Sequence, residues 1–187
     1  MGKVYSVIDD TLRAFIEAQH MFFVATAPSN GGHVNLSPKG LNALRILGPT
    51  TVAYIDYVGS GIETIAHLRE NQRIVLMLCA FEGPPKTIRL HGEGHVIEPQ
   101  DVEFGSLMPY FEVLPGMRSI IRVELTRISD SCGYSTPLYR FDRQRSQLAE
   151  WAERKGDSGL LEYQCKTNVS SIDGLAGLRW PVPTEKR

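Results

Sequence analysis

The sequence predicts a mainly β domain, a small antiparallel barrel that is closed or half closed, with peripheral helices between and after its strands. Three observations support this fold class. Short segments rich in β-forming residues recur along the chain, and Gly-, Pro- and Asn-rich turns separate them. Strands and helices do not alternate regularly, as a doubly wound parallel sheet would require. The 187 residues, of which 42% are hydrophobic and 22% charged, suit a single domain with a real core.

The first elements are a helix and a β-hairpin. We expect a helix over residues 9–19, because an aspartate at either of its first two positions can cap it and apolar side chains follow at helical spacing. Residues 21–27 and 33–37 are expected to form two strands. The Asn-Gly-Gly sequence in the turn at 28–32 supplies positive φ angles at little cost, which favours a hairpin.

The middle of the chain contains a strand, a helix and a second strand. Residues 51–56 alternate as a strand, a Gly-Ser-Gly sequence interrupts them, and residues 62–70 are expected to form a helix of about three turns. Residues 73–81 are almost all apolar. This run predicts a central strand buried on both faces.

The next segment, residues 86–97, alternates strongly between polar and apolar side chains. Gly92 and Gly94 lie on its inner face, where they permit strong bending or the close approach of another backbone. The polar face carries Thr87, Arg89, His91, Glu93 and His95. A helix at 99–111 and a long strand at 119–128 follow, which gives about six strands in all.

Domain organisation and cellular location follow from composition. We expect one domain over residues 1–187, with a barrel core at about 9–130 and a helical extension at about 140–187. The net charge of -1 gives no reason to expect nucleic acid or a membrane as a partner. The sequence shows no signal peptide and no apolar run that could span a bilayer. Three widely spaced cysteines, an odd number, predict a reduced, cytoplasmic protein.

Two turns could bind an anion. In Ser37-Pro38-Lys39-Gly40 the lysine could meet a phosphate, but for this segment taken alone a plain turn with a solvated lysine is the favoured interpretation. The segment 57–64 ends a strand, turns through glycine and serine, and begins a helix whose free N–H groups favour a phosphate. Ser60 could instead simply cap that helix. The segment lacks the lysine of a P-loop, which excludes a nucleoside triphosphatase of that class.

Two other segments carry side chains that could bind a metal or act as a nucleophile. In His91-Gly-Glu-Gly-His95 the polar side chains share a strand face but are about 6.5 Å apart, so we predict no metal site. The segment 130–137 contains Cys132, which has no histidine near it in sequence. A structural turn is the favoured interpretation, with pocket lining as the alternative.

The order of these segments resembles the pyridoxamine 5′-phosphate oxidase-like, FMN-binding split-barrel family over roughly residues 10 to 130. The motifs that carry the resemblance are Phe23-Val-Ala-Thr-Ala27, His33-Val-Asn-Leu-Ser-Pro-Lys-Gly40, Tyr54-Ile-Asp56, Ile65-Ala-His-Leu-Arg-Glu-Asn71 and Thr87-Ile-Arg-Leu-His-Gly-Glu-Gly94. The resemblance implies a six-stranded antiparallel split β-barrel and a homodimer with flavin sites shared between its subunits.

The resemblance also implies a layout for FMN. The phosphate would lie near Lys39 and the start of the helix at 62–70, and the flavin ring along the strands at 35–37 and 51–56. Side chains from the strand at 86–97 would reach the cofactor, from the same subunit or from its partner. The cofactor-binding residues implied are Asn35, Ser37, Lys39, Gly40, Asp56, Tyr57, Ser60, Gly61, Thr64, Thr87 and Arg89.

One departure from the family bears on activity. Oxidases of pyridoxamine phosphate carry Ser-Arg-Lys at the start of this helix, where the present chain has Ile62-Glu63-Thr64. The missing positive charges argue against that substrate, and predict weaker flavin binding or a phosphate held mainly by backbone N–H groups. The implied function is an FMN-dependent oxidoreductase acting on a small molecule, with no catalytic residue assigned. The alternatives are a non-enzymatic flavin-binding or sensing protein, or the same barrel with deazaflavin F420 or haem.

Overall fold

Eight strands form one antiparallel sheet in the computed structural model, which describes residues 2–179. The strands are β1 (Val4–Tyr5), β2 (Phe22–Thr26), β3 (Asn35–Lys39), β4 (Leu44–Gly48), β5 (Thr51–Tyr57), β6 (Arg73–Cys79), β7 (Thr87–Ile97) and β8 (Met117–Ser131). The helices are α1 (Asp10–Glu17), α2 (Glu63–Asn71), α3 (Val102–Leu107), the 3₁₀ helix η1 (Met108–Tyr110) and α4 (Gln147–Thr167). The mainly β fold with peripheral helices is therefore confirmed.

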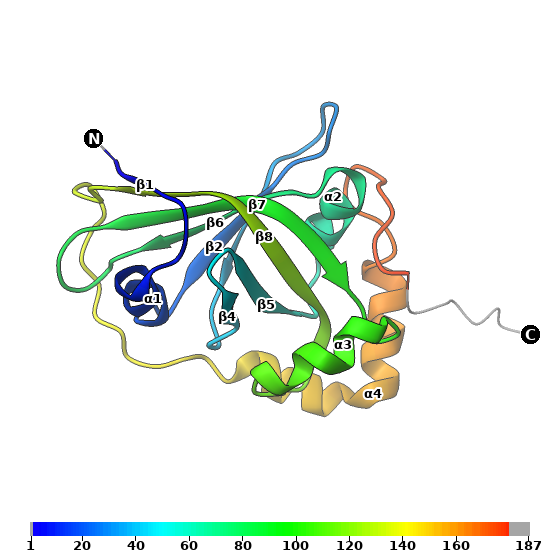
Figure 1. Ribbon diagram of the computed structural model, residues 1–187. Helices are drawn as coiled ribbons and strands as arrows, with labels where there is room; N and C mark the ends of the chain where they lie inside the picture. The colour runs from blue at the N-terminus through cyan, green and yellow to red at the C-terminus, as the bar shows by residue number, and fades with distance from the viewer. Residues whose placement is uncertain (1, 180–187) are drawn as a thin grey trace, which may run out of the picture.

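The sheet curls into an open barrel. Its strand order is β3-β2-β6-β7-β8-β5-β4, with β1 added on β8, so β3 and β4 are its two edges (Figure 1). Contacts across the interior show the curl. The rings of Phe22 in β2 and Tyr54 in β5 pack edge to face at 5.5 Å, although three strands separate them in the sheet. Consecutive strands β3 and β4 do not pair with each other, and the barrel is split between them.

The structure has eight strands rather than about six, because the sequence interpretation missed β1 and β4. β1 has only two residues, which pair with Ile128 and Ser129 of β8. β4 lacks the alternation of a half-buried strand, and all five of its residues are half-buried. It exists because a tight turn at residues 48–51 folds it back onto β5. The other predicted strands are all present.

The predicted strand at 33–37 lies two residues further along, as Asn35–Lys39. Its partner β2 sets this register, with Phe22 opposite Lys39 and Thr26 opposite Asn35. Because side chains alternate with a period of two, a two-residue shift keeps the same alternation of side chains between the two faces of the strand. Asn35, Ser37 and Lys39 therefore share one face of β3.

The prediction that residues 73–81 are buried on both faces was wrong. Ile74, Leu76 and Leu78 are buried in the barrel, but Val75 and Met77 are only half-buried. Each strand of a curled sheet points alternate side chains outward, so Val75 and Met77 lie on the outer face of β6. One face of β6 is thus left partly open.

Close approach of another backbone explains the glycine in the middle of β7. The ladder between β7 and β8 shifts register between His91 and Gly92, and a Cβ on Gly92 would collide with the carbonyl oxygen of Glu124. A bulge of this kind increases local twist and helps a sheet to close.

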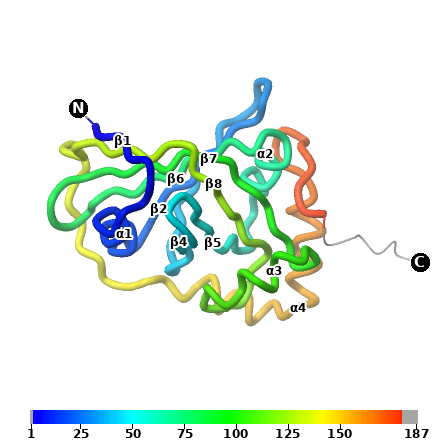
Figure 2. The backbone as a smooth tube through the Cα atoms, viewed as in Figure 1, coloured from blue at the N-terminus to red at the C-terminus, as the bar shows by residue number. Residues whose placement is uncertain are grey.

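Helices surround the barrel on its open sides. The carboxylate of Asp9 accepts a hydrogen bond of 2.8 Å from the Leu12 N–H, which caps α1, and Leu12 and Ile16 on α1 are buried in the core. α2 lies near one end of β7, and α3 and α4 lie together on the other side of the molecule from α1 (Figures 1 and 2). The predicted extension at 140–187 contains α4, and its residues 180–187 lie outside the described part.

Candidate functional site

One face of β3 points toward the start of α2 and the end of β5. Its first residue, Asn35, donates an amide hydrogen bond of 2.9 Å to the Thr64 hydroxyl in α2. Its last residue, Lys39, lies 3.2 Å from the Asp56 carboxylate at the end of β5. Ser37 lies between them on the same face of the strand. The structure therefore joins two pairs of the eleven predicted residues, Asn35 with Thr64 and Lys39 with Asp56, and places Ser37 on β3 between the two pairs.

Asp56 is fully buried and lies between two cations. Arg118 of β8 donates from Nε to Oδ2 at 2.6 Å, and Lys39 donates from Nζ to Oδ1 at 3.2 Å. Burial alone would raise the pKa of Asp56, but the charges and hydrogen bonds of Arg118 and Lys39 outweigh it and lower the pKa below its ordinary value. The carboxylate is thus ionised at neutral pH and fixes the position of the Lys39 ammonium.

Arg118 ties this pair to the segment that precedes α2. Its Nη1 donates to the Gly61 carbonyl at 3.0 Å and to the Asn168 side-chain oxygen at 2.9 Å, and Asn168 in turn donates to the Gly59 carbonyl at 3.0 Å. We call Lys39, Asp56, Arg118 and Asn168 the Asp56 cluster. It contains two positive charges and one negative charge, so it is a net cationic site next to the N-terminus of α2.

The start of α2 has free N–H groups but also an acidic side chain. The N-cap residue, Ile62, provides no side-chain hydrogen bond. Ser60 is exposed and does not cap the helix, contrary to the capping interpretation. The Glu63 carboxylate folds back toward Gly61 and accepts a hydrogen bond of 3.3 Å from the Ile172 N–H. An anion at this helix end would therefore meet Glu63 first.

A second group of hydrogen bonds continues from Asn35 into the core. Asn35 also donates to the Thr26 hydroxyl at 3.2 Å, and Thr26 lies 3.0 Å from Nδ1 of His67 in α2. Burial lowers the pKa of His67, against the opposing effect of the nearby Glu63, so the imidazole is neutral at pH 7. Within the described residues its buried Nε2 has no hydrogen-bond partner.

Thr87 and Arg89 do not join these groups within one chain. Thr87 is buried beside Cys79, 3.8 Å from its sulfur. Arg89 is on the outer face of the sheet, where it donates to the Ser131 hydroxyl at 3.0 Å. Tyr57 is half-buried at the end of β5, and Gly40 begins the turn after β3.

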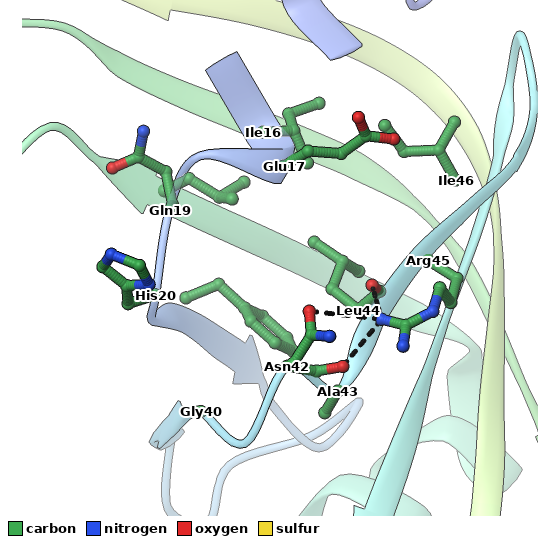
Figure 3. Close-up of a pocket in the computed structure, with 12 residues that line it drawn as sticks. Ile16, Glu17, Gln19, His20, Gly40, Asn42, Ala43, Leu44, Arg45 and Ile46 are labelled. Carbon is green, nitrogen blue, oxygen red and sulfur yellow. Dashed lines mark hydrogen bonds between the residues drawn. The ribbon is translucent and has the colours of Figure 1, made fainter. Parts of the chain in front are cut away.

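That turn separates two pockets. Leu41 and Asn42 both have positive φ, 58° and 51°, and the Ala43 N–H donates to the Gly40 carbonyl, as in a tight type I′ turn. A pocket of about 260 Å³ lies between this turn, the end of α1 and β4 (Figure 3). Its one arginine, Arg45, donates to the backbone oxygens of Asn42 and Leu44.

The larger pocket, of about 920 Å³, lies on the other side of the turn. One wall is the extended segment between β8 and α4, residues 134–146, which we call the strap and which runs below α1 and β4 in Figure 1. The opposite walls are the connection before β2, the end of β3 and the loop after β6. Lys39 lines this strap groove and also belongs to the Asp56 cluster.

Sequence reasoning missed Arg118, Asn168 and the strap. Arg118 lies two residues before the apolar run Ile120-Ile121, but Arg122 directly follows that run, so the sequence did not single out Arg118 as the buried arginine that needs an acidic partner. Asn168 and the strap lie after the barrel core in the sequence, in segments where no motif indicated a functional site. Cys132 is exposed after β8.

Within residues 2–179, no group of three or more His, Cys, Asp or Glu side chains is arranged to hold a metal ion. In the same part of the chain, no helix combines the length and the apolar character needed to cross a membrane.

Comparison with known proteins places the chain in a family. Residues 8–132 match the family model described as pyridoxamine 5′-phosphate oxidase. A pyridoxamine 5′-phosphate oxidase family protein of Aspergillus flavus is 38% identical over 195 residues, which cover 95% of this chain and 78% of the relative.

Solved structures show the same fold at low identity. HupZ of Group A Streptococcus is similar with a TM-score of 0.52 and 17% identity, covering 72% of this chain and 99% of HupZ. A candidate pyridoxamine 5′-phosphate oxidase of Lactobacillus delbrueckii has a TM-score of 0.53 and 14% identity, covering 67% and 98%. The open antiparallel sheet is a split barrel, and the chain belongs to the pyridoxamine 5′-phosphate oxidase family.

Proposed function

We propose that this protein binds FMN and acts as a flavin-dependent oxidoreductase on a small molecule. One observation carries the proposal: Lys39 is a fixed cation with a fifth of its side chain exposed, paired with the buried Asp56, whose other partner Arg118 contacts the Gly61 carbonyl just before α2. A single phosphate can be bound there by the ammonium and by the N–H groups of the first helical turn. Membership of the family supports the choice of a flavin.

The residues present fit a phosphate monoester, with one adjustment. Ser60 is exposed and can turn its hydroxyl toward the anion, and the first turn of α2 has no side-chain cap. Glu63 must rotate away from Gly61, which its half-buried position allows. The segment has no Gly-x-Gly-x-x-Gly sequence, so we infer a mononucleotide rather than FAD.

Each residue of the Asp56 cluster has a defined part in this proposal. Bound FMN supplies the redox chemistry. Lys39 neutralises the phosphate, Asp56 keeps the ammonium in place, and Arg118 fixes the backbone before α2 through the Gly61 carbonyl. We assign no acid or base, because the described side chains at the site are engaged in binding and positioning.

The same proposal includes a homodimer whose subunits share each flavin site. The outer face of β3, β2 and β6 is apolar and partly open: Leu36 is 64% exposed, and Phe23, Ala25, Val75 and Met77 are half-buried. A contiguous apolar face of this kind indicates a protein interface. Arg89 points outward next to it, so a twofold pair of subunits allows Arg89 of one to reach the flavin of the other.

Titration of the flavin-free protein with FMN tests the proposal. We expect flavin fluorescence to change on binding, and Lys39→Ala to weaken affinity about tenfold or more, since a charge-assisted contact is worth roughly 1.5–3 kcal/mol. Lys155→Ala, an exposed lysine on α4, is the matched control and should bind as the parent does.

Four results would contradict the proposal. Unchanged affinity in Lys39→Ala would leave Lys39 only a structural role, as the ion-pair partner of Asp56. Recovery of FAD by mass spectrometry of the released cofactor would replace FMN, and absence of flavin binding after reconstitution would exclude a flavoprotein. Sedimentation at low concentration should give a dimer, and a monomer that keeps its flavin would refute the shared site.

Turnover with NADH or NADPH and a series of electron acceptors tests whether the protein is an oxidoreductase.

A further inference from the structure

The strap is attached to the barrel at several separate places. The Tyr139 N–H donates to the Phe81 carbonyl at 2.9 Å, and the Phe141 N–H donates to the Glu82 carboxylate at 3.0 Å. The Gln144 side chain accepts from the Leu41 N–H at 3.0 Å and donates to the His20 carbonyl at 3.1 Å. These bonds define the walls of the strap groove without filling it.

Aromatic side chains line much of the groove. The ring of Phe141 stacks on His20, with centroids 3.7 Å apart and planes inclined by 16°. Tyr139 and Phe81 pack with ring centroids 5.5 Å apart, and both line the groove. Tyr139 and Phe141 remain exposed, at 63% and 40%. Exposed flat rings that face a space of about 920 Å³ favour a ligand with an aromatic or planar apolar part.

The charges of the groove are mostly positive. Lys39, Arg140, Arg143 and Arg145 line it, together with the acids Glu82 and Asp142. Glu82 accepts from the Phe141 N–H, and Asp142 pairs with Arg143 at 3.6 Å. In the described part of the chain Arg140 and Arg145 have no carboxylate partner. Two arginines beside aromatic walls suit an anionic group on a flat ligand.

From this combination we infer that the strap groove is the binding site for an aromatic substrate that carries an anionic group, a carboxylate or a phosphate ester. The inference rests on the proposed function, because Lys39 belongs to both the groove and the proposed phosphate site and thus places the two ligands side by side. Arg140 and Arg145 bind the anion, and Phe141 packs against the ring. The strap follows residues 8–132, the part that matches the family model.

Fluorescence titration with 8-anilinonaphthalene-1-sulfonate, a flat aromatic anion, tests the inference on the full chain. N-phenyl-1-naphthylamine, which has the same rings without the sulfonate, is the matched neutral probe. We expect the double variant Arg140→Ala/Arg145→Ala to bind the anionic probe at least about tenfold more weakly while its affinity for the neutral probe is unchanged. Phe141→Ala should weaken both. Arg154→Ala, an exposed arginine on α4, should change neither.

The outcomes separate this inference from the proposed function. Equal loss of both probes in the double arginine variant, or no loss of either, overturns the anion site while FMN binding still tests the flavin proposal. Competition between FMN and the anionic probe for a single site would mean that the groove is the flavin site, which overturns a separate substrate site. Simultaneous binding supports it. Competition of benzoate and of phenyl phosphate with the probe then tells which anion the groove prefers.

Discussion

Asp56→Asn removes one charge from the buried ion-pair cluster and leaves the shape of the side chain almost unchanged. Removing one partner from a buried pair costs about 3–5 kcal/mol, because the other charge remains in a poorly solvated place. The two partners of Asp56 differ in exposure. Lys39 has a fifth of its side chain exposed, so its ammonium can be solvated when Asp56 loses its charge. Arg118 is only 5% exposed, so its guanidinium would remain buried without a carboxylate. We therefore expect the lower end, about 3 kcal/mol, or a fall in Tm of roughly 6–12 °C for a chain of this size.

The loss of unfolding free energy in Asp56→Asn should depend on pH in a defined direction. The folded-state pKa of Asp56 is lowered from the ordinary value of 3.8, so the cluster stabilises the protein fully above that value. As pH falls through the folded-state pKa, Asp56 becomes protonated and the stabilisation is lost. The difference in unfolding free energy between the parent and Asp56→Asn should accordingly be largest at neutral pH and shrink below pH 3.8.

Urea unfolding at several pH values measures this difference, and an FMN titration of the same variants adds a second readout. Glu98→Gln is the matched control, because Glu98 is also fully buried and pairs with Arg69 and Arg179 away from Lys39. We expect both variants to lose stability but only Asp56→Asn to lose FMN affinity. A loss of less than about 1 kcal/mol at pH 7, or one that does not vary with pH, would refute the reasoning.

Three further outcomes follow from the structure. Glu63→Gln should tighten FMN binding about fivefold, because it removes a competing charge worth roughly 1 kcal/mol from the start of α2; weaker binding in a titration would show that Glu63 assists the cofactor. Leu36→Glu should give monomers in sedimentation, whereas Val102→Glu, at a residue that is 99% exposed, should leave the dimer intact; a dimeric Leu36→Glu would place the interface elsewhere. Gly92→Ala should cost about 1–3 kcal/mol through its collision with β8, while Gly105→Ala in α3 meets open space and should be neutral or slightly stabilising; equal effects in thermal melts would contradict the bulge.

The register of β3 illustrates why sequence reasoning could place the candidate residues on a face but not in a site. The strand expected at 33–37 forms at Asn35–Lys39, and because a shift of two residues keeps the same alternation, Asn35, Ser37 and Lys39 form a row on one face. Which side chains lie opposite this row of β3 depends on how the whole sheet curls. Asp56 is 17 residues from Lys39 and 62 from Arg118, and no local period relates them.

Alternation, glycine turns and ordered motifs are local properties of the chain, so they sufficed to predict the mainly β class, the approximate bounds of most strands, the start of α2 and the family. Three features could be seen only in the folded chain: Arg118 and Asn168 join Lys39 and Asp56, one face of β6 stays partly open, and the strap forms one wall of a groove. These features depend on contacts between segments far apart in the chain. Such contacts form only when the sheet curls and buries charged side chains in pairs. They therefore depend on tertiary packing, and residues adjacent in the sequence do not predict them.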